Sequence, residues 1–324
     1  MTTIWRIFLA VAPLLTVAVG GPSALAQDLK VVATIRPIHS LAAAVMQGVA
    51  EPRLLVEGTA SPHTFVMKPS DAKALSDATV LIRVSESLEP FTIKVIPSLP
   101  KRVTVVTLEA IPGLTLHPMR TGATFEAHDD GAHKGHGHGH KHAAPKSGAG
   151  AGTDGHIWLD PDNAKVISRH LAEVLGNIAP PHAARFRANA DALVGRLDSL
   201  AKDITETVKP AAGRNYIVFH DADQYCERRY GLAPVGSVTI SPDVPASAKR
   251  IAALRRKVTD LKVACVFAEP QFAPKLIEPI IETTPARRGT LDPLGAAIPA
   301  GPDQYFGLMR ALANDLRACL AEPA

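Results

Sequence analysis

Short apolar runs alternate with stretches of helical periodicity along the first third of the chain. Residues 30–35 (KVVATI) form a β-branched run that leaves no room for a hairpin before the helical pattern at 38–47. Strands and helices that alternate at this spacing predict a parallel sheet with helices on both faces. The alternation continues with strands at 53–56, 79–83 and 103–107 and helices at 69–77 and 88–99.

A long amphipathic segment follows in the middle of the chain. After a helical pattern at 161–178, residues 181–209 keep apolar positions near helical spacing without interruption. Such a helix is about 40 Å long, enough to cross a whole domain, so we expect a strut between two lobes. The alternation then resumes, with strands at 216–219, 233–238, 263–268 and 289–291 and helices at 223–230, 245–259 and 304–320. The predicted class is α/β.

The first 26 residues have the pattern of a secretory signal. Arg6 precedes an apolar run at 7–19, and Ala24-Leu25-Ala26 predicts cleavage before Gln27. The run is shorter than the ~20 residues that a membrane span needs and contains Pro13, which disfavours an anchor. We therefore expect the mature chain outside the cytoplasm, with no stable membrane insertion.

Composition adds two limits. The formal net charge of +4 at pH 7 is too balanced to indicate a nucleic-acid partner. A chain of 324 residues with 46% hydrophobic residues would bury a large core, more readily as two lobes than as one.

A histidine-rich stretch interrupts the first lobe. Six of the thirteen histidines fall in HDDGAHKGHGHGHKH, where Gly and Lys supply no apolar periodicity, so we expect a mobile loop. Neutral imidazoles bind zinc, copper and nickel, and a flexible strand of them would collect such ions with little control of geometry. A solvated linker or an engineered tag is the competing interpretation, although this run is internal. The auxiliary candidates are His128, His133, His136, His138, His140 and His142.

The chain has three cysteines, of which two can pair in an oxidising compartment. We pair Cys265, in an apolar strand-like run, with Cys319, in the last predicted helix. Cys226 is then interpreted as a buried thiol and not as a nucleophile, because its surroundings contain no clear base.

Three further histidines follow strands or lie in loops: His63 in GTASPHTFVMKPSD, His156 in GHIWLDP and His220 in IVFHDADQY. Ligands of open parallel sheets gather beyond the carboxyl ends of the strands, where these positions are expected. Any one of them alone is usually a structural histidine. Three placed alike, beside a histidine-rich loop, favour a metal site between the lobes.

The motifs around these residues carry a family resemblance. They are ASPH with KPSD, GHIWLDP, VFHDA followed by YG, VACVFAEPQF and GTLDPLG. With them the chain resembles the periplasmic zinc-binding components of Znu-type ABC importers, in the cluster A-I group of solute-binding proteins, over essentially its whole mature length. The resemblance implies two Rossmann-like lobes, zinc bound by His63, His156 and His220, and a disulfide between Cys265 and Cys319.

On this basis we expect a signal peptide at 1–26, an N-terminal lobe at 27–180 that includes the His-rich loop at 117–155, a linking helix at 181–210 and a C-terminal lobe at 211–324. The fourth zinc ligand stays open. Some relatives have a carboxylate where this chain has Pro62, and Asp292 in GTLDPLG either ligates or caps the turn at Pro293. Glu269 is interpreted as a supporting or interlobe residue and not as a ligand, and Asp221 as either orienting an imidazole or capping a helix.

The leading functional hypothesis is capture of zinc in the periplasm and delivery to the membrane permease of an ABC importer by a monomer that catalyses no reaction. Three neutral imidazoles favour zinc over manganese, which prefers oxygen ligands. A zinc hydrolase is the rival, since three histidines and a water also form a catalytic site, but no HEXXH motif is present. A secreted zinc buffer or chaperone is the third alternative.

Overall fold

A computed structural model describes residues 29–120, 152–239, 242, 246–282 and 284–321. The predicted signal peptide and the six histidines of the predicted auxiliary loop lie outside these ranges. Within them, every helix is too short or too polar to traverse a lipid bilayer.

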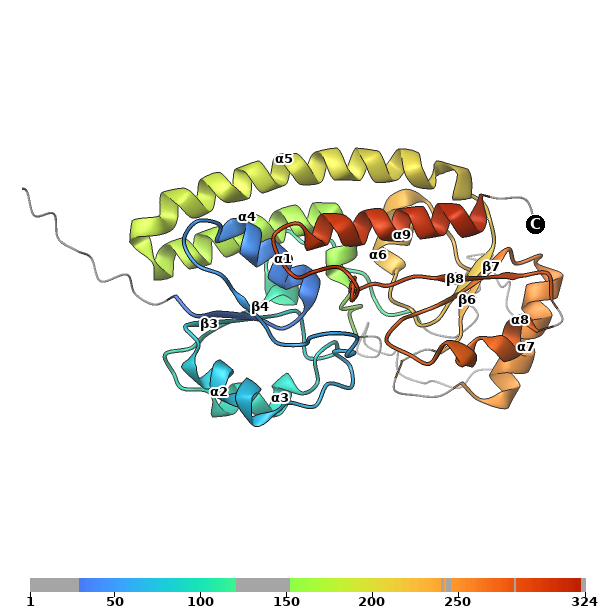
Figure 1. Ribbon diagram of the computed structural model, residues 1–324, viewed down its shortest axis with the longest axis horizontal. Coiled ribbons are helices and arrows are strands. Elements are labelled where there is room, and N and C mark those ends of the chain that lie inside the picture. Colours follow the sequence, from blue (N-terminus) through green and yellow to red (C-terminus); the bar gives the residue numbers. More distant parts are fainter. Residues whose placement is uncertain (1–28, 121–151, 240–241, 243–245, 283, 322–324) are drawn as a thin grey trace, which may run out of the picture.

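The N-terminal lobe is built on a four-stranded parallel sheet in the order β2-β1-β3-β4. Valine, leucine and isoleucine fill its central strands, which are buried because helices cover both faces. Helices α1 and α4 pack on one face, and α2 packs on the other, where Leu75 meets Val32 and Leu81 (Figure 1). The elements are β1 (Val31–Ala33), α1 (Arg36–Val45), β2 (Arg53–Leu54), α2 (Pro69–Asp77), β3 (Val80–Arg83), α3 (Thr92–Val95), β4 (Thr104–Thr107) and α4 (Pro161–Ile178).

The C-terminal lobe repeats this topology with a second parallel sheet in the order β6-β5-β7-β8. Helices α7 and α8 cover one face, and α6 and α9 lie on the other (Figure 1). The predicted α/β class with two lobes is therefore confirmed. The elements are β5 (Tyr216–Val218), α6 (Gln224–Tyr230), β6 (Gly236–Ser237), α7 (Ala248–Asp260), β7 (Cys265–Ala268), α8 (Glu278–Ile281), β8 (Arg287–Thr290) and α9 (Gln304–Leu320).

One predicted helix is much shorter than expected. Instead of spanning 88–99, the segment forms only α3, followed by a 3₁₀ turn at Ile96–Ser98. Pro97 has no backbone N–H to donate, so the α-helical hydrogen bonding stops there. Apolar periodicity alone does not reveal this break.

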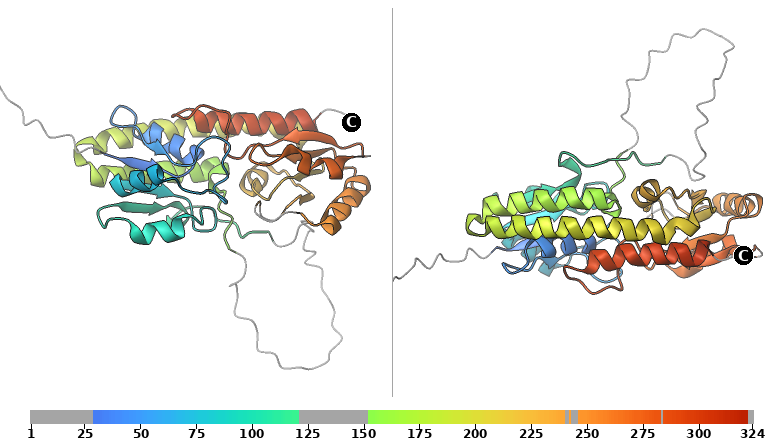
Figure 2. Two further views of the ribbon diagram at one scale, coloured as in Figure 1. Left: turned by 60° about the horizontal axis from the view of Figure 1, so that its bottom comes forward. Right: turned by 90° about the horizontal axis from the view of Figure 1, so that it is seen from above.

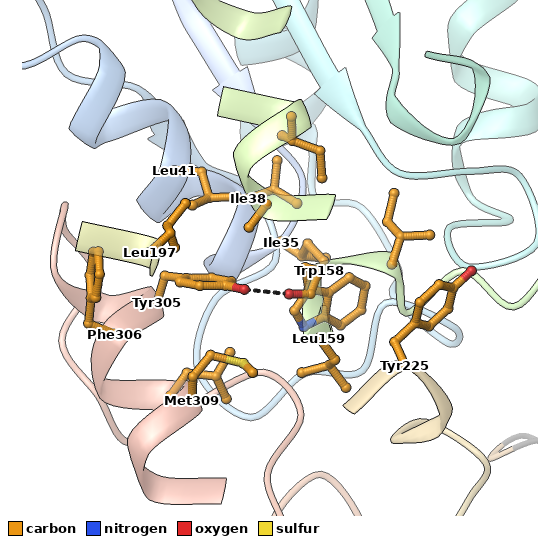
Figure 3. Packing of buried hydrophobic residues seen from close by; sticks show 14 of the residues in the cluster. Ile35, Ile38, Leu41, Trp158, Leu159, Leu197, Tyr225, Tyr305, Phe306 and Met309 are labelled. Atoms are coloured by element: carbon orange, nitrogen blue, oxygen red, sulfur yellow. Dashed lines mark hydrogen bonds between the residues drawn. The ribbon is translucent and has the colours of Figure 1, made fainter. Parts of the chain in front are cut away.

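The long helix α5 (Ala183–Val208) runs past both lobes, and α4 and α9 lie alongside it (Figures 1 and 2). Because α9 follows the last strand of the C-terminal sheet yet packs on α1 and α5, one hydrophobic core continues from lobe to lobe. Figure 3 shows Tyr305 and Met309 of α9 in this shared core beside Leu197 of α5 and Ile38 of α1. The Tyr305 hydroxyl donates to the Trp158 carbonyl at 2.7 Å (Figure 3).

A disulfide joins Cys265 of β7 to Cys319 of α9, as the sequence predicts, at a sequence separation of 54. It ties the last helix to the C-terminal sheet. Cys226 is a buried free thiol, and burial raises its pKa well above the ordinary value, which keeps it protonated and unreactive.

Replacing both bridged cysteines by alanine is expected to lower the free energy of unfolding by about 4 kcal/mol, because the cross-link restricts a loop of this length in the unfolded chain. Urea unfolding of oxidised wild type and of the Cys265→Ala/Cys319→Ala variant measures the difference. A reductant should destabilise wild type similarly and leave the variant unchanged. Equal stability of the two oxidised proteins would contradict the prediction.

Candidate metal centre

The three histidines that the sequence singles out meet between the two sheets. His63 lies in the loop between β2 and α2, His156 immediately precedes a 3₁₀ turn (Ile157–Leu159), and His220 follows β5. One ring nitrogen from each residue lies within 4.8 Å of the others. The Nε2 atoms of His156 and His220 are 3.3 Å apart. Segments separated by up to 157 positions along the chain thus supply one cluster of imidazoles.

Two carboxylates fix the orientation of two of these rings. Asp154 Oδ1 lies 2.7 Å from Nδ1 of His156, and Glu269 Oε1 lies 2.5 Å from Nδ1 of His220. The same two oxygens also accept the backbone N–H groups of the two histidines, at 3.0 Å each. A carboxylate accepts a hydrogen bond, so each Nδ1 carries the proton, and the lone pair of each neutral ring is on Nε2. Those lone pairs face the centre of the cluster.

His63 completes the cluster from the more open side. Its Nε2 is buried and makes no hydrogen bond to the described residues. Burial, followed by the proximity of His220 and His156, holds the pKa of His63 well below its usual value. The imidazole is therefore neutral at physiological pH, and its lone pair is available to a metal ion.

His220 has the opposite electrostatic balance. Burial is the largest single influence and opposes a charge on the ring, yet the negative charge and hydrogen bond of Glu269 together raise the pKa of His220 above its ordinary value. In the metal-free protein the His220 ring therefore binds a proton more readily than an ordinary histidine does.

The wall around the imidazoles is mostly apolar. Trp158, Phe272 and Leu294 line the pocket, together with Pro62 and Pro293. The Trp158 indole N–H donates to the Pro293 carbonyl at 2.9 Å, so a side chain of the N-terminal lobe is fixed to the C-terminal lobe beside the cluster. Such a wall limits access of water and favours a dehydrated ion held by nitrogen ligands.

The Asp292 carboxylate accepts three hydrogen bonds from residues near the cluster. Its Oδ1 accepts from the backbone N–H of Leu294 at 3.0 Å and from the Gln271 amide at 2.7 Å, and its Oδ2 accepts from the backbone N–H of Ala296 at 2.6 Å. Across the described ranges, the only group of three or more histidine, cysteine or acidic side chains with suitably close ligand atoms is the trio of imidazoles. In this arrangement Asp292 caps the turn that contains Pro293.

The supporting residues are found only partly by sequence reasoning. Glu269 lies behind His220, in agreement with the supporting role expected for it. Asp221 orients none of the three imidazoles and instead forms an ion pair with Arg120 at 2.8 Å. Asp154 is missed altogether. Its position two residues before His156 is the one available signal, and nothing in the surrounding Gly-rich sequence distinguishes it from a solvated loop acid.

The sequence of this chain matches a known protein family. Residues 31–319 match the family described as ZnuA, the periplasmic component A of a zinc-uptake complex. The high-affinity zinc uptake system protein ZnuA of Brucella suis is 44% identical over 306 residues, covering 90% of this chain and 92% of the relative. The protein of that name from Haemophilus ducreyi is 38% identical over 309 residues, covering 95% and 98%.

A solved structure agrees in fold. The crystal structure of a ZnuA protein superposes with a TM-score of 0.74 and covers 90% of this chain and 99% of that one, at 22% sequence identity. A likeness at this identity supports the architecture alone. The match to the family extends from the first strand to the last helix, and the chain therefore belongs to the ZnuA family of periplasmic zinc-uptake components.

Proposed function

We propose that this protein captures zinc through His63, His156 and His220 and delivers it to the permease of an ABC importer. The observation that carries the proposal is the set of three ring nitrogens within 4.8 Å of one another, with two of the rings held in the required tautomer by Asp154 and Glu269. The proposal is supported by the relatives, which are named high-affinity zinc uptake system proteins.

The spacing of the nitrogens suits zinc. Two imidazoles bound to one tetrahedral Zn²⁺ at the usual Zn–N distance have their nitrogens about 3.3 Å apart. The Nε2 atoms of His156 and His220 are already 3.3 Å apart. When both Nδ1 atoms donate their protons to carboxylates, the Nε2 atoms of the two neutral rings face each other with a lone pair each and no hydrogen between them. A bound cation removes this repulsion between the two lone pairs. Manganese prefers oxygen ligands and would gain less from three nitrogens.

The fourth coordination position is proposed to be water. Pro62 has no ligand atom, and Asp292 is engaged in its turn. Binding without catalysis is the proposed role, so an ester or peptide turnover assay of the zinc-loaded protein should show no activity above free zinc. Release of zinc to a permease then requires that the ligands separate. His63 is the least buried of the three histidines, so we propose that the ion leaves on its side.

Several features of the sequence extend the proposal. We infer that residues 1–26 are removed on secretion and that the mature chain works as a periplasmic monomer, with the N-terminal lobe at 27–180, the linking helix at 181–210 and the C-terminal lobe at 211–324. The six histidines between 128 and 142 are proposed to gather zinc near the primary site by raising its local concentration.

Alanine at any of the three clustered histidines is expected to weaken zinc binding by more than the roughly 10- to 100-fold that loss of an outer partner costs, because an inner ligand is removed. Competition titration with a chromophoric chelator gives the dissociation constant. His170→Ala, which changes a histidine on α4 outside the cluster, is the matched control. Full affinity in His63→Ala would remove that residue from the site.

Zinc affinity is expected to fall as pH decreases, beginning above about pH 6.5. Zinc binds neutral imidazole, and the raised pKa of His220 means that this ring gains a competing proton first, whereas the lowered pKa of His63 keeps that ring neutral to lower pH. Titrations at several pH values should show that the number of protons released per zinc increases as the pH falls. In Glu269→Gln the fall should begin at lower pH. Constant affinity from pH 7.5 to 5 would exclude a three-histidine site.

Asp154→Asn and Glu269→Gln are each expected to reduce zinc affinity by about 10- to 100-fold at pH 8, because the ring that each carboxylate orients loses its fixed tautomer. Asp292→Asn is the comparison. It should leave zinc affinity near wild type and lower thermal stability through its turn. A loss of zinc affinity in Asp292→Asn as large as that of a histidine variant would instead make Asp292 the fourth ligand.

A further inference from the structure

A short two-stranded segment, here called the stem, precedes His156. It consists of residues 117–120 and 152–154, and it pairs through an antiparallel bridge between Pro118 and Thr153. The Met119 backbone N–H donates to the Gly152 carbonyl at 2.8 Å, and that of Asp154 donates to the His117 carbonyl at 2.9 Å. The stem therefore ends in Asp154, the carboxylate that orients His156.

Side chains of the C-terminal lobe hold this stem of the N-terminal lobe. Tyr225 of α6, whose ring lies in the shared core (Figure 3), donates its hydroxyl to the Asp154 carbonyl at 2.8 Å and accepts from the His117 backbone N–H at 3.1 Å. The amide of Gln224 donates to the Pro118 carbonyl at 3.2 Å and to Asp154 Oδ2 at 3.1 Å. The stem is thus fastened to the first turn of α6.

Arg120 adds a charged contact between the same two parts. Its guanidinium forms an ion pair with Asp221 at 2.8 Å and a hydrogen-bonded ion pair with Glu227. The side chain of Arg120 is 20% exposed, and those of Asp221 and Glu227 are 13% and 4% exposed, so water screens these pairs weakly. A planar guanidinium has several N–H donors and can bind both carboxylates at once, whereas the compact ammonium group of lysine binds two carboxylates less well.

The contacts of Arg120 lead to two of the three imidazoles. Asp221 directly follows His220, and Arg120 belongs to the stem that ends in Asp154 beside His156. Resting on the proposed zinc function, we infer that Arg120 is a positioning residue. By clamping the stem to Asp221 and Glu227, it holds His156 and His220 at the separation that one zinc ion requires.

The alternative is that Arg120 stabilises the fold without affecting the geometry of the site. A further possibility is purely electrostatic: a cation near the cluster repels Zn²⁺, so its removal would strengthen binding. These three roles, positioning, stabilisation of the fold and charge repulsion, predict different effects of replacing Arg120. Only a positioning role predicts that the coordination geometry of the ion changes when the guanidinium is replaced.

The test uses the full mature chain with Arg120→Met, Arg120→Lys and, as a matched control, Arg310→Met. Arg310 pairs with Asp203 at 3.8 Å across α9 and α5, away from the site. Two quantities are measured: the visible absorption of the Co²⁺-substituted protein, which reports coordination geometry, and the rate of zinc release to an excess of chelator. Thermal melting of each zinc-free variant establishes that it folds.

In Arg120→Met we expect zinc release to be about tenfold faster and the cobalt spectrum to change, in line with the loss of a group that orients ligands. The zinc release rate and cobalt spectrum of Arg120→Lys should lie between those of Arg120→Met and wild type, and those of Arg310→Met should match wild type. If Arg120→Met does not fold, Glu227→Gln, which leaves the pair with Asp221, should still change the cobalt spectrum and accelerate release in the same direction.

An unchanged spectrum and release rate in folded Arg120→Met, or in Glu227→Gln when it is needed, would overturn the inference and leave the proposed function intact. Slower zinc release would also overturn it, in favour of simple charge repulsion. A wild-type protein that binds neither Co²⁺ nor Zn²⁺ would remove the proposed function together with this inference.

Discussion

The two lobes share one hydrophobic core, and the meeting of the three imidazoles depends on it. Helix α9 leaves the C-terminal sheet and packs between α1 and α5, so residues such as Tyr305 are buried by both halves of the chain. Separating the lobes would expose this apolar surface to water, which is strongly unfavourable. The crevice between the sheets is therefore set mainly by packing, so its width does not depend on a bound ion.

Within that crevice, buried charges determine the state of the imidazoles. A buried carboxylate is costly unless it is hydrogen bonded, and Asp154 and Glu269 each accept both a ring N–H and a backbone N–H. The same contacts that satisfy these two acids direct the Nε2 lone pairs to one point. Stability of the buried acids and readiness of the site for a cation thus have a common origin.

The acids around α6 extend this logic beyond the ligands. Burial, and then the acidic neighbours of Asp223, raise the pKa of Asp223 well above its ordinary value. Burial also raises the pKa of Glu227 to about 7, and Glu227 forms an ion pair with the guanidinium of Arg120. Carboxylates buried this close together disfavour the charged form, so each one that stays ionised requires a neutralising partner. Arg120 is one such partner, and it reaches these acids from the other lobe.

Periodicity and the spacing of motifs were enough to predict the α/β class, the two lobes and the long helix, because those patterns are local and repeat every two or 3.6 residues. The loop positions of His63 and His156, and the position of His220 just after a strand, likewise follow from the chain order. The sequence also indicated a supporting role for Glu269, but only tertiary structure showed that Asp154, and not Asp221, orients a second ring, and that the Asp292 carboxylate accepts hydrogen bonds in its own turn. These choices depend on which side chains the packing of the two lobes brings within 3 Å, and a carboxylate in a Gly-rich segment has the same local sequence whether it faces solvent or an imidazole.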